Sequence, residues 1–128
     1  MANRNFYPMG GSLSREVKEL FGKVTIGASG AISSQDCLGF TVAKTSGETG
    51  RYTVTLADKY YAFRTCLVTV IGVTDAALTV LYAGVRNEAV ATTKTFDVQF
   101  VGAIGTDTNP ASGNVLCFAI QLQNAADV

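Results

Sequence analysis

RYTVTL, at Arg51–Leu56, is the stretch of sequence that decides the fold class. Tyr52, Val54 and Leu56 alternate with three polar residues, so the apolar side chains share one face and the polar side chains share the other. Successive side chains of a strand point to opposite sides of a sheet, and such alternation is therefore typical of a half-buried strand. We predict a strand here with one face in the protein core.

Period-two patterns on either side of this stretch predict further strands and bring the total to about seven. The expected ranges are residues 17–26, 40–44, 66–73, 78–85, 96–101 and 115–122. Residues 66–73 are apolar on both faces apart from Thr69, which predicts a central or doubly covered strand. In the last range Gln121 is expected to face outward, as is Gln123 just after it. The inward side chains are expected to be Leu116, Phe118, Ile120 and Leu122.

Two segments leave alternatives open. In the first range the apolar residues could form one face of a helix that ends at Gly22. Alternatively, Leu20, Val24 and Ile26 alternate as in a strand, with Gly22 as a bulge. We favour the strand. Residues 58–63 (DKYYAF) could form a single helical turn.

Short strands separated by turns rich in Gly, Ser, Thr and Asp predict an all-β fold. We expect residues 17–128 to form a single antiparallel domain, which could be a β-sandwich, a jelly-roll-like fold or a small barrel, with a polar surface loop at residues 105–114. Residues 1–16 are polar around one aromatic pair, Phe6 and Tyr7, and predict an extended N-terminal arm. This arm is either a docking peptide or an irregular terminus.

The composition favours a protein that works inside an assembly. The chain has 128 residues, enough for one domain, and is 48% hydrophobic but only 16% charged, so much of its surface is uncharged or covered by another molecule. The formal net charge is +0 and no run of basic residues occurs, which argues against nucleic acid as a partner. No apolar stretch has the length of a membrane span and the N-terminus lacks a secretory signal pattern, so we expect cytoplasmic synthesis and no membrane partner.

Residue types on which most enzymes depend are missing. The chain has no histidine, which removes the commonest general base and imidazole metal sites. The three cysteines lack paired CxxC spacing: Cys66 and Cys117 lie in apolar runs and are expected to be buried reduced thiols, and Cys37 is the candidate for exposure. Asp107 and Asn109 resemble a fragment of a calcium loop without its other acidic ligands, so a turn role is favoured.

We therefore predict no catalytic residues, no metal and no cofactor, and a protein that is not an enzyme. A small β-barrel enzyme that uses Asp, Glu, Tyr or Lys as acid and base is the least favoured alternative.

Four strings resemble small structural proteins of tailed bacteriophages. They are RNFYPMGGSLSREV (residues 4–17), GKVTIGASGAISSQD (residues 22–36), GFTVAK (residues 39–44) and TGRYTVTLADKY (residues 49–60). The resemblance covers the first half of the chain, and its motifs are turns and strands rather than catalytic signatures. Such proteins are often encoded near the major capsid protein and are described as minor structural or head decoration proteins.

The resemblance implies a capsid decoration or cement protein that binds the assembled shell of the major capsid protein, commonly as a homo-oligomer, with a trimer favoured. It would stabilise the shell by mass action, on the capsid surface of a virion assembled in the host cytoplasm. Arg4, Phe6, Tyr7 and Leu13 of the arm are the expected partner contacts, with strand addition as one mode of binding. The alternative is a phage tail or head-fibre module whose loops, such as residues 105–114, bind a host receptor or glycan.

Overall fold

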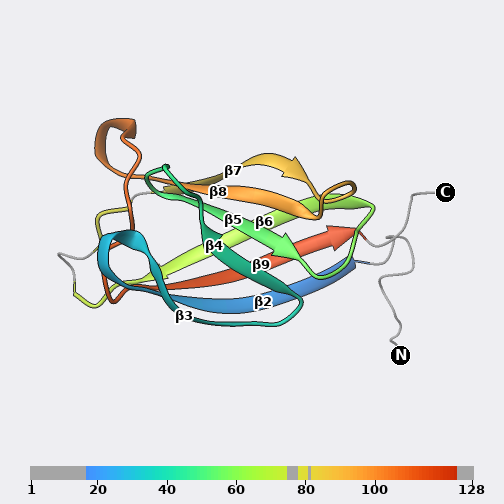
Figure 1. Ribbon diagram of the computed structural model, residues 1–128, viewed down its shortest axis with the longest axis horizontal. Helices are drawn as coiled ribbons and strands as arrows, with labels where there is room; N and C mark the ends of the chain where they lie inside the picture. The colour runs from blue at the N-terminus through green and yellow to red at the C-terminus, as the bar shows by residue number, and fades with distance from the viewer. Residues whose placement is uncertain (1–16, 75–77, 81, 124–128) are drawn as a thin grey trace, which may run out of the picture.

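A computed structural model describes residues 17–74, 78–80 and 82–123, and in these residues the fold is all-β. Two antiparallel four-stranded sheets pack face to face (Figure 1). The first sheet contains β2 (Val17–Ile26), β3 (Ile32–Cys37), β6 (Ala62–Ile71) and β9 (Val115–Gln123), and the second contains β4 (Phe40–Lys44), β5 (Arg51–Leu56), β7 (Tyr82–Ala89) and β8 (Thr95–Val101). The predicted sandwich is confirmed. The barrel alternative is wrong, because no described strand of one sheet pairs with a strand of the other.

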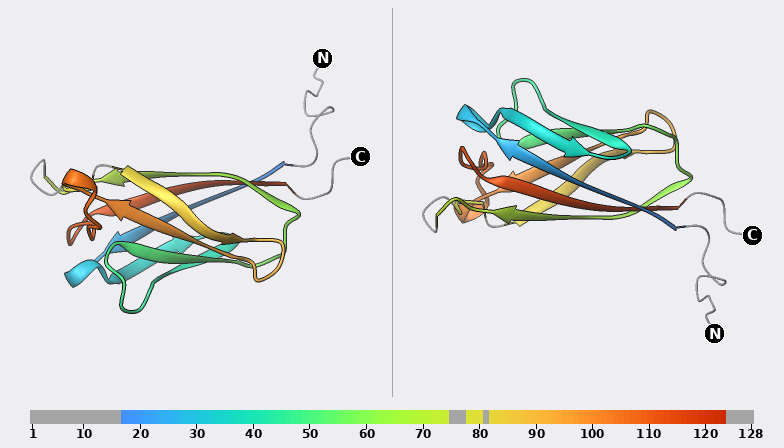
Figure 2. Two further views of the ribbon diagram at one scale, coloured as in Figure 1. Left: turned by 90° about the horizontal axis from the view of Figure 1, so that it is seen from above. Right: turned by 90° about the horizontal axis from the view of Figure 1, so that it is seen from below.

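The strand order is β3-β2-β9-β6 in the first sheet and β4-β5-β8-β7 in the second. Two short 3-10 helices, Ala28–Gly30 and Ala103–Gly105, lie at one end of the sandwich, as both views of Figure 2 show. At the other end the first residue of β2, Val17, pairs with Gln123, the last residue of β9. β6 and β7 are the last strands of their sheets on one side of the sandwich, and β3 and β4 are the last strands on the other.

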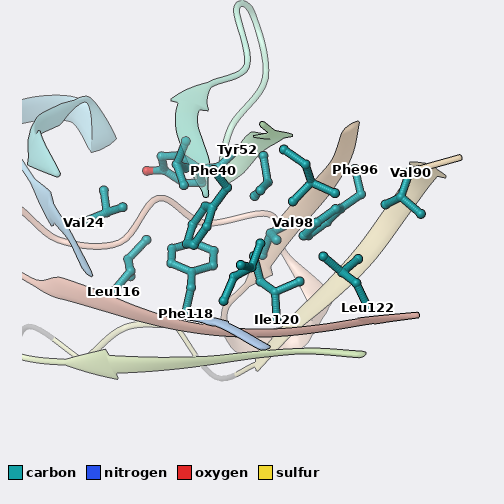
Figure 3. Packing of buried hydrophobic residues seen from close by; sticks show 14 of the residues in the cluster. Val24, Phe40, Tyr52, Val90, Phe96, Val98, Leu116, Phe118, Ile120 and Leu122 are labelled. Atoms are coloured by element: carbon teal, nitrogen blue, oxygen red, sulfur yellow. The ribbon is translucent and has the colours of Figure 1, made fainter. Parts of the chain in front are cut away.

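The core lies between the sheets and is formed by their inward faces (Figure 3). Tyr52, Val54 and Leu56 are fully buried, as their alternation predicts. The core also contains the buried apolar side chains of β9, namely Leu116, Phe118, Ile120 and Leu122. Complete burial of one such side chain stabilises the fold by about 1.5–3 kcal/mol, so these two inward faces supply much of the driving force for folding.

The sequence missed one strand, so the described residues form eight strands rather than about seven. β3 has the sequence ISSQDC, which is too polar to show alternation, and forms because its backbone pairs with β2. The first range is a strand, as favoured, but Gly22 is not a bulge: the register runs through it and shifts between Thr25 and Ile26.

Several expectations around β6 and β7 are wrong. Residues 58–63 form no helical turn, and β6 already begins at Ala62. β6 is an edge strand rather than a central one, because apolar residues on both faces do not reveal how many neighbours a strand has. β7 covers Tyr82–Ala89, later than expected. Gln123 is only 3% exposed, although the sequence predicts that it faces solvent.

Gly22 is required for packing rather than for a backbone kink. A Cβ atom at this position would lie 2.6 Å from Cys37 Sγ and 2.7 Å from Phe40 Cζ. We expect Gly22→Ala to lower the free energy of unfolding by about 1–3 kcal/mol, the usual cost of overpacking, in chemical denaturation. Gly84→Ala is the matched control, since nothing lies within 4 Å of its Cβ position. Equal stability of the two variants would contradict this account.

Candidate functional site: an apolar sheet face

Six apolar side chains from three neighbouring strands lie on the outer face of the first sheet. We call this set the apolar face: Phe21, Leu67, Ile71, Val115, Cys117 and Ala119. Phe21, Ala119 and Leu67 are direct cross-strand partners on β2, β9 and β6. They form one row across the sheet, and Ile71 pairs with Val115 in a parallel row.

The apolar face is open to solvent in the single chain. Phe21 is 61% exposed, Leu67 66% and Ile71 51%. Soluble proteins rarely leave contiguous apolar patches uncovered unless the patch meets a partner. This exposure therefore marks the outer face of the first sheet as the candidate docking surface.

A shallow hollow extends the apolar face toward β3. Its volume is about 390 Å³, and Phe21, Leu38 and Cys117 are among the residues that line it. Leu38 is 78% exposed in the β3–β4 turn, where its backbone N–H donates to the carbonyl oxygen of Phe21. The hollow gives a partner side chain a place to insert between two apolar residues.

Charged residues lie at the border of the apolar face. Lys23 on β2 pairs directly with Asp36 on β3, so opposite charges are neighbours on that side. At the end near the start of β2, the Gln121 amide nitrogen donates to a Glu19 carboxylate oxygen at 2.7 Å. This arrangement of an apolar centre with a polar rim is typical of protein–protein interfaces.

The outer face of the second sheet has the opposite character. Asp97 accepts hydrogen bonds from the Thr53 hydroxyl and the Asn87 amide, each at 2.9 Å. Arg51 donates to Gln99 Oε1 at 3.1 Å and forms an ion pair with Glu48 at 3.2 Å. These polar groups satisfy one another and remain compatible with water, so the two outer faces of the sandwich are chemically different.

No protein-family model matches this chain, and no curated protein or solved structure matches it. The assignment of a function therefore depends on the residues themselves. In the described part of the chain, no helix is both long and apolar enough to cross a bilayer. The same residues contain no group of three Cys, Asp or Glu side chains placed to hold a metal ion.

The predicted partner contacts Arg4, Phe6, Tyr7 and Leu13 lie outside the described residues. The apolar face itself was missed by the sequence analysis. Its signal was the apolar character of both faces of residues 66–73, combined with the low charge of the whole chain. Those features predict that another layer or another molecule covers the strand. They do not predict that the strand is at the edge of its sheet, with its outer face exposed in the single chain.

The three cysteines are free thiols and all are partly buried. Cys66 packs against the core, whereas Cys117 belongs to the outer, apolar face and not to the interior as expected. The exposure expected for Cys37 is also wrong, because its side chain packs against the core. Burial raises the pKa of Cys37, and the neighbouring Asp36 carboxylate raises it further.

The remaining candidate ligand sites are structural. Asn109 Oδ1 accepts a hydrogen bond from the Gly50 N–H at 2.6 Å, and its amide donates to the Ser29 carbonyl at 3.4 Å. The turn role is thus confirmed for Asn109, which ties residues 105–114 to two other turns. Of the two adjacent tyrosines, Tyr60 is buried in the core and Tyr61 is 55% exposed, so the two rings lie in different environments.

The Cys66 thiol makes the stability of the fold sensitive to alkaline pH. Burial raises its pKa from 9.0 to about 12, so the folded protein keeps a proton that the unfolded chain releases. This contribution is complete below pH 9 and is lost as the pH rises toward 12. We expect Cys66→Ala to show a shallower loss of unfolding free energy over that interval than the parent chain, and Cys117→Ala to be the control. An equally steep loss in Cys66→Ala would contradict the assignment.

Proposed function

We propose that this chain is a virion structural protein of a tailed bacteriophage, a capsid decoration or cement protein that binds the assembled shell of the major capsid protein. The observation that carries the proposal is the difference between the two outer faces of the sandwich. The apolar face spans three strands and exposes Phe21, Leu67 and Ile71, whereas the opposite face is polar and internally hydrogen-bonded. A protein that lies on a shell needs one face for the shell and one for water.

Docking through the apolar face requires no covalent or catalytic step. Burial of Phe21, Leu67 and Ile71 against the shell supplies the hydrophobic driving force, and the border residues Lys23 and Glu19 select orientation. Because the chain binds only the assembled shell, its binding free energy opposes disassembly. A non-enzymatic role follows from this mechanism.

The phage context comes from the resemblance of the first half of the chain to phage structural proteins. In this setting the protein resides on the capsid surface and is added in the host cytoplasm. Arg4, Phe6, Tyr7 and Leu13 of the arm supplement the apolar face with contacts to the shell or to neighbouring subunits. The form attached to the shell is a homo-oligomer. The trimer that the resemblance favours refers to this attached form and not to the free protein.

A receptor-binding tail or fibre module is less well supported. Its best candidate loop, residues 105–114, has Asn109 engaged with the backbone of Gly50 and Ser29. The Asn109 amide therefore serves the fold rather than a ligand.

Copy number distinguishes the two roles. We expect quantitative mass spectrometry of purified particles of the encoding phage to find this chain in numbers comparable to the major capsid protein, because a decoration protein follows the shell lattice. A handful of copies per particle would overturn the decoration role and assign the chain to the tail or a fibre.

The apolar face is tested by adding one charge to it. We expect Phe21→Asp and Leu67→Asp each to weaken binding to undecorated shells at least about tenfold in co-sedimentation, since burying an apolar side chain of this size contributes about 1.5–3 kcal/mol. Both side chains are exposed, so the fold should tolerate the change. Thr55→Asp puts the same charge on the second sheet and should bind normally. Full shell binding by both face variants would exclude this surface.

A further inference from the structure

We propose that two copies of this chain pair in solution through the free edge of β6, antiparallel and about a two-fold axis, so that their first sheets join into one continuous sheet. The contact involves no shell protein and does not depend on the function proposed above. Four features of the molecule lead to it: the edge itself, the state of the other edges, a hollow beside β6, and the sequence of β6.

Over residues 65–71 the edge of β6 lacks the features that keep sheets apart, and both the charged Arg64 and the register shift between Phe63 and Thr65 come before this stretch. Within the described residues β6 has a hydrogen-bonded neighbour, β9, on one side only. Residues 65–71 (TCLVTVI) contain no charged residue, no proline and no glycine, and their register with β9 is regular. A long, regular and uncharged edge strand exposes a row of backbone groups that readily pairs with another strand.

The edge strands on the opposite side of the sandwich are joined to each other. The side-chain amide of Gln35 on β3 donates to the Val42 carbonyl oxygen at 3.0 Å, and its oxygen accepts from the Val42 N–H at 2.9 Å. The amide thus takes the place of a neighbouring strand for Val42 on β4. This bridge occupies the backbone groups of Val42 that face away from β5.

The fourth edge strand, β7, is guarded by charge and irregularity. It carries Arg86 and Glu88, its register shifts before Ala89, and Asn87 has a φ of 55°. Charged side chains and bulges are the usual means by which an edge strand avoids pairing. Of the edge strands described, β6 alone combines length, regularity and absence of charge over seven residues.

A hollow of about 340 Å³ runs beside β6 between the two sheets. Val68 and Val70 of β6 line it together with Leu78, Val80 and Tyr82 from the chain before and at the start of β7. Leu78 and Tyr82 remain 47% and 59% exposed. A strand added to β6 would cover the open side of this hollow and remove apolar surface from water.

The sequence of β6 fits a second copy of itself. Antiparallel pairing centred on Val68 places Cys66 opposite Val70 and Leu67 opposite Thr69, so inner side chains meet inner ones, and no like charges meet. The seven paired residues give a ladder of about 24 Å. The arm of a neighbouring copy is a poorer occupant, because Pro8 cannot donate to a ladder and Gly10 is depleted in strands.

The test combines sedimentation velocity with hydrogen exchange on the full chain. We expect the mass to rise from one chain to two as concentration increases, with amide exchange slowing in residues 65–71 and not in β7. Thr69→Lys, an exposed position in the middle of the edge, should keep the chain monomeric, as should Thr65→Lys. Thr55→Lys, on the outer face of the second sheet, is the matched control and should still dimerise; far-ultraviolet circular dichroism establishes that each variant is folded.

Each other outcome overturns the proposal. A chain that stays monomeric at all concentrations has no such contact. A trimer, or a dimer that persists in folded Thr69→Lys and Thr65→Lys, places the contact elsewhere. A dimer lost on removal of residues 1–16 assigns the contact to the arm. Because no shell is present, none of these results bears on whether the apolar face binds capsids.

Discussion

The structure depends on a constraint that a two-layer fold imposes on β9. This strand is apolar along its inward face and at three of its outward positions, but only the inward face, from Leu116 to Leu122, can pack against the second sheet. Its outward residues Val115, Cys117 and Ala119 must then lie on the surface, between those of β2 and β6. Phe21 and Leu67 flank Ala119 and Ile71 lies beside Val115, whereas Cys117 lies between Lys23 and Thr69. The outer surface is therefore largely, but not entirely, apolar across three strands. The candidate docking surface therefore results from apolar residues on both sides of β9, a pattern that is typical of a sheet covered by another layer on each face.

The two sides of the sandwich solve the problem of free strand edges differently. On one side the Gln35 amide joins β3 to β4 with two hydrogen bonds, which replaces a backbone ladder by a single side chain. On the other side β6 and β7 lie on either side of the hollow lined by Val68 and Tyr82. β7 carries Arg86 and Glu88, whereas the one charged residue of β6, Arg64, lies before the regular stretch at residues 65–71. An isolated chain would carry β6 as an aggregation hazard. A defined partner for this edge removes that hazard.

The sequence predicts the core better than the surface. Alternation identifies Arg51–Leu56 and the inward face of β9, because burial on one side of a sheet imposes period two. β3 escapes prediction since ISSQDC has no apolar face and exists only through pairing with β2. For residues 66–73 the apolar pattern is the same whether a strand is covered by its own fold or by another molecule. The sequence pattern of the candidate site is therefore the same as that of a buried strand, and the sequence alone does not distinguish the two.

The β6 contact and the apolar face reinforce each other geometrically. A two-fold axis perpendicular to the joined sheet leaves both apolar faces on the same side, so Leu67 of one copy lies beside Thr69 of the other and the two surfaces merge. For the proposed capsid role, a pair that reaches a shell would present twice the apolar surface of one copy. The polar network around Asp97 lies on the far side of both copies and remains in water.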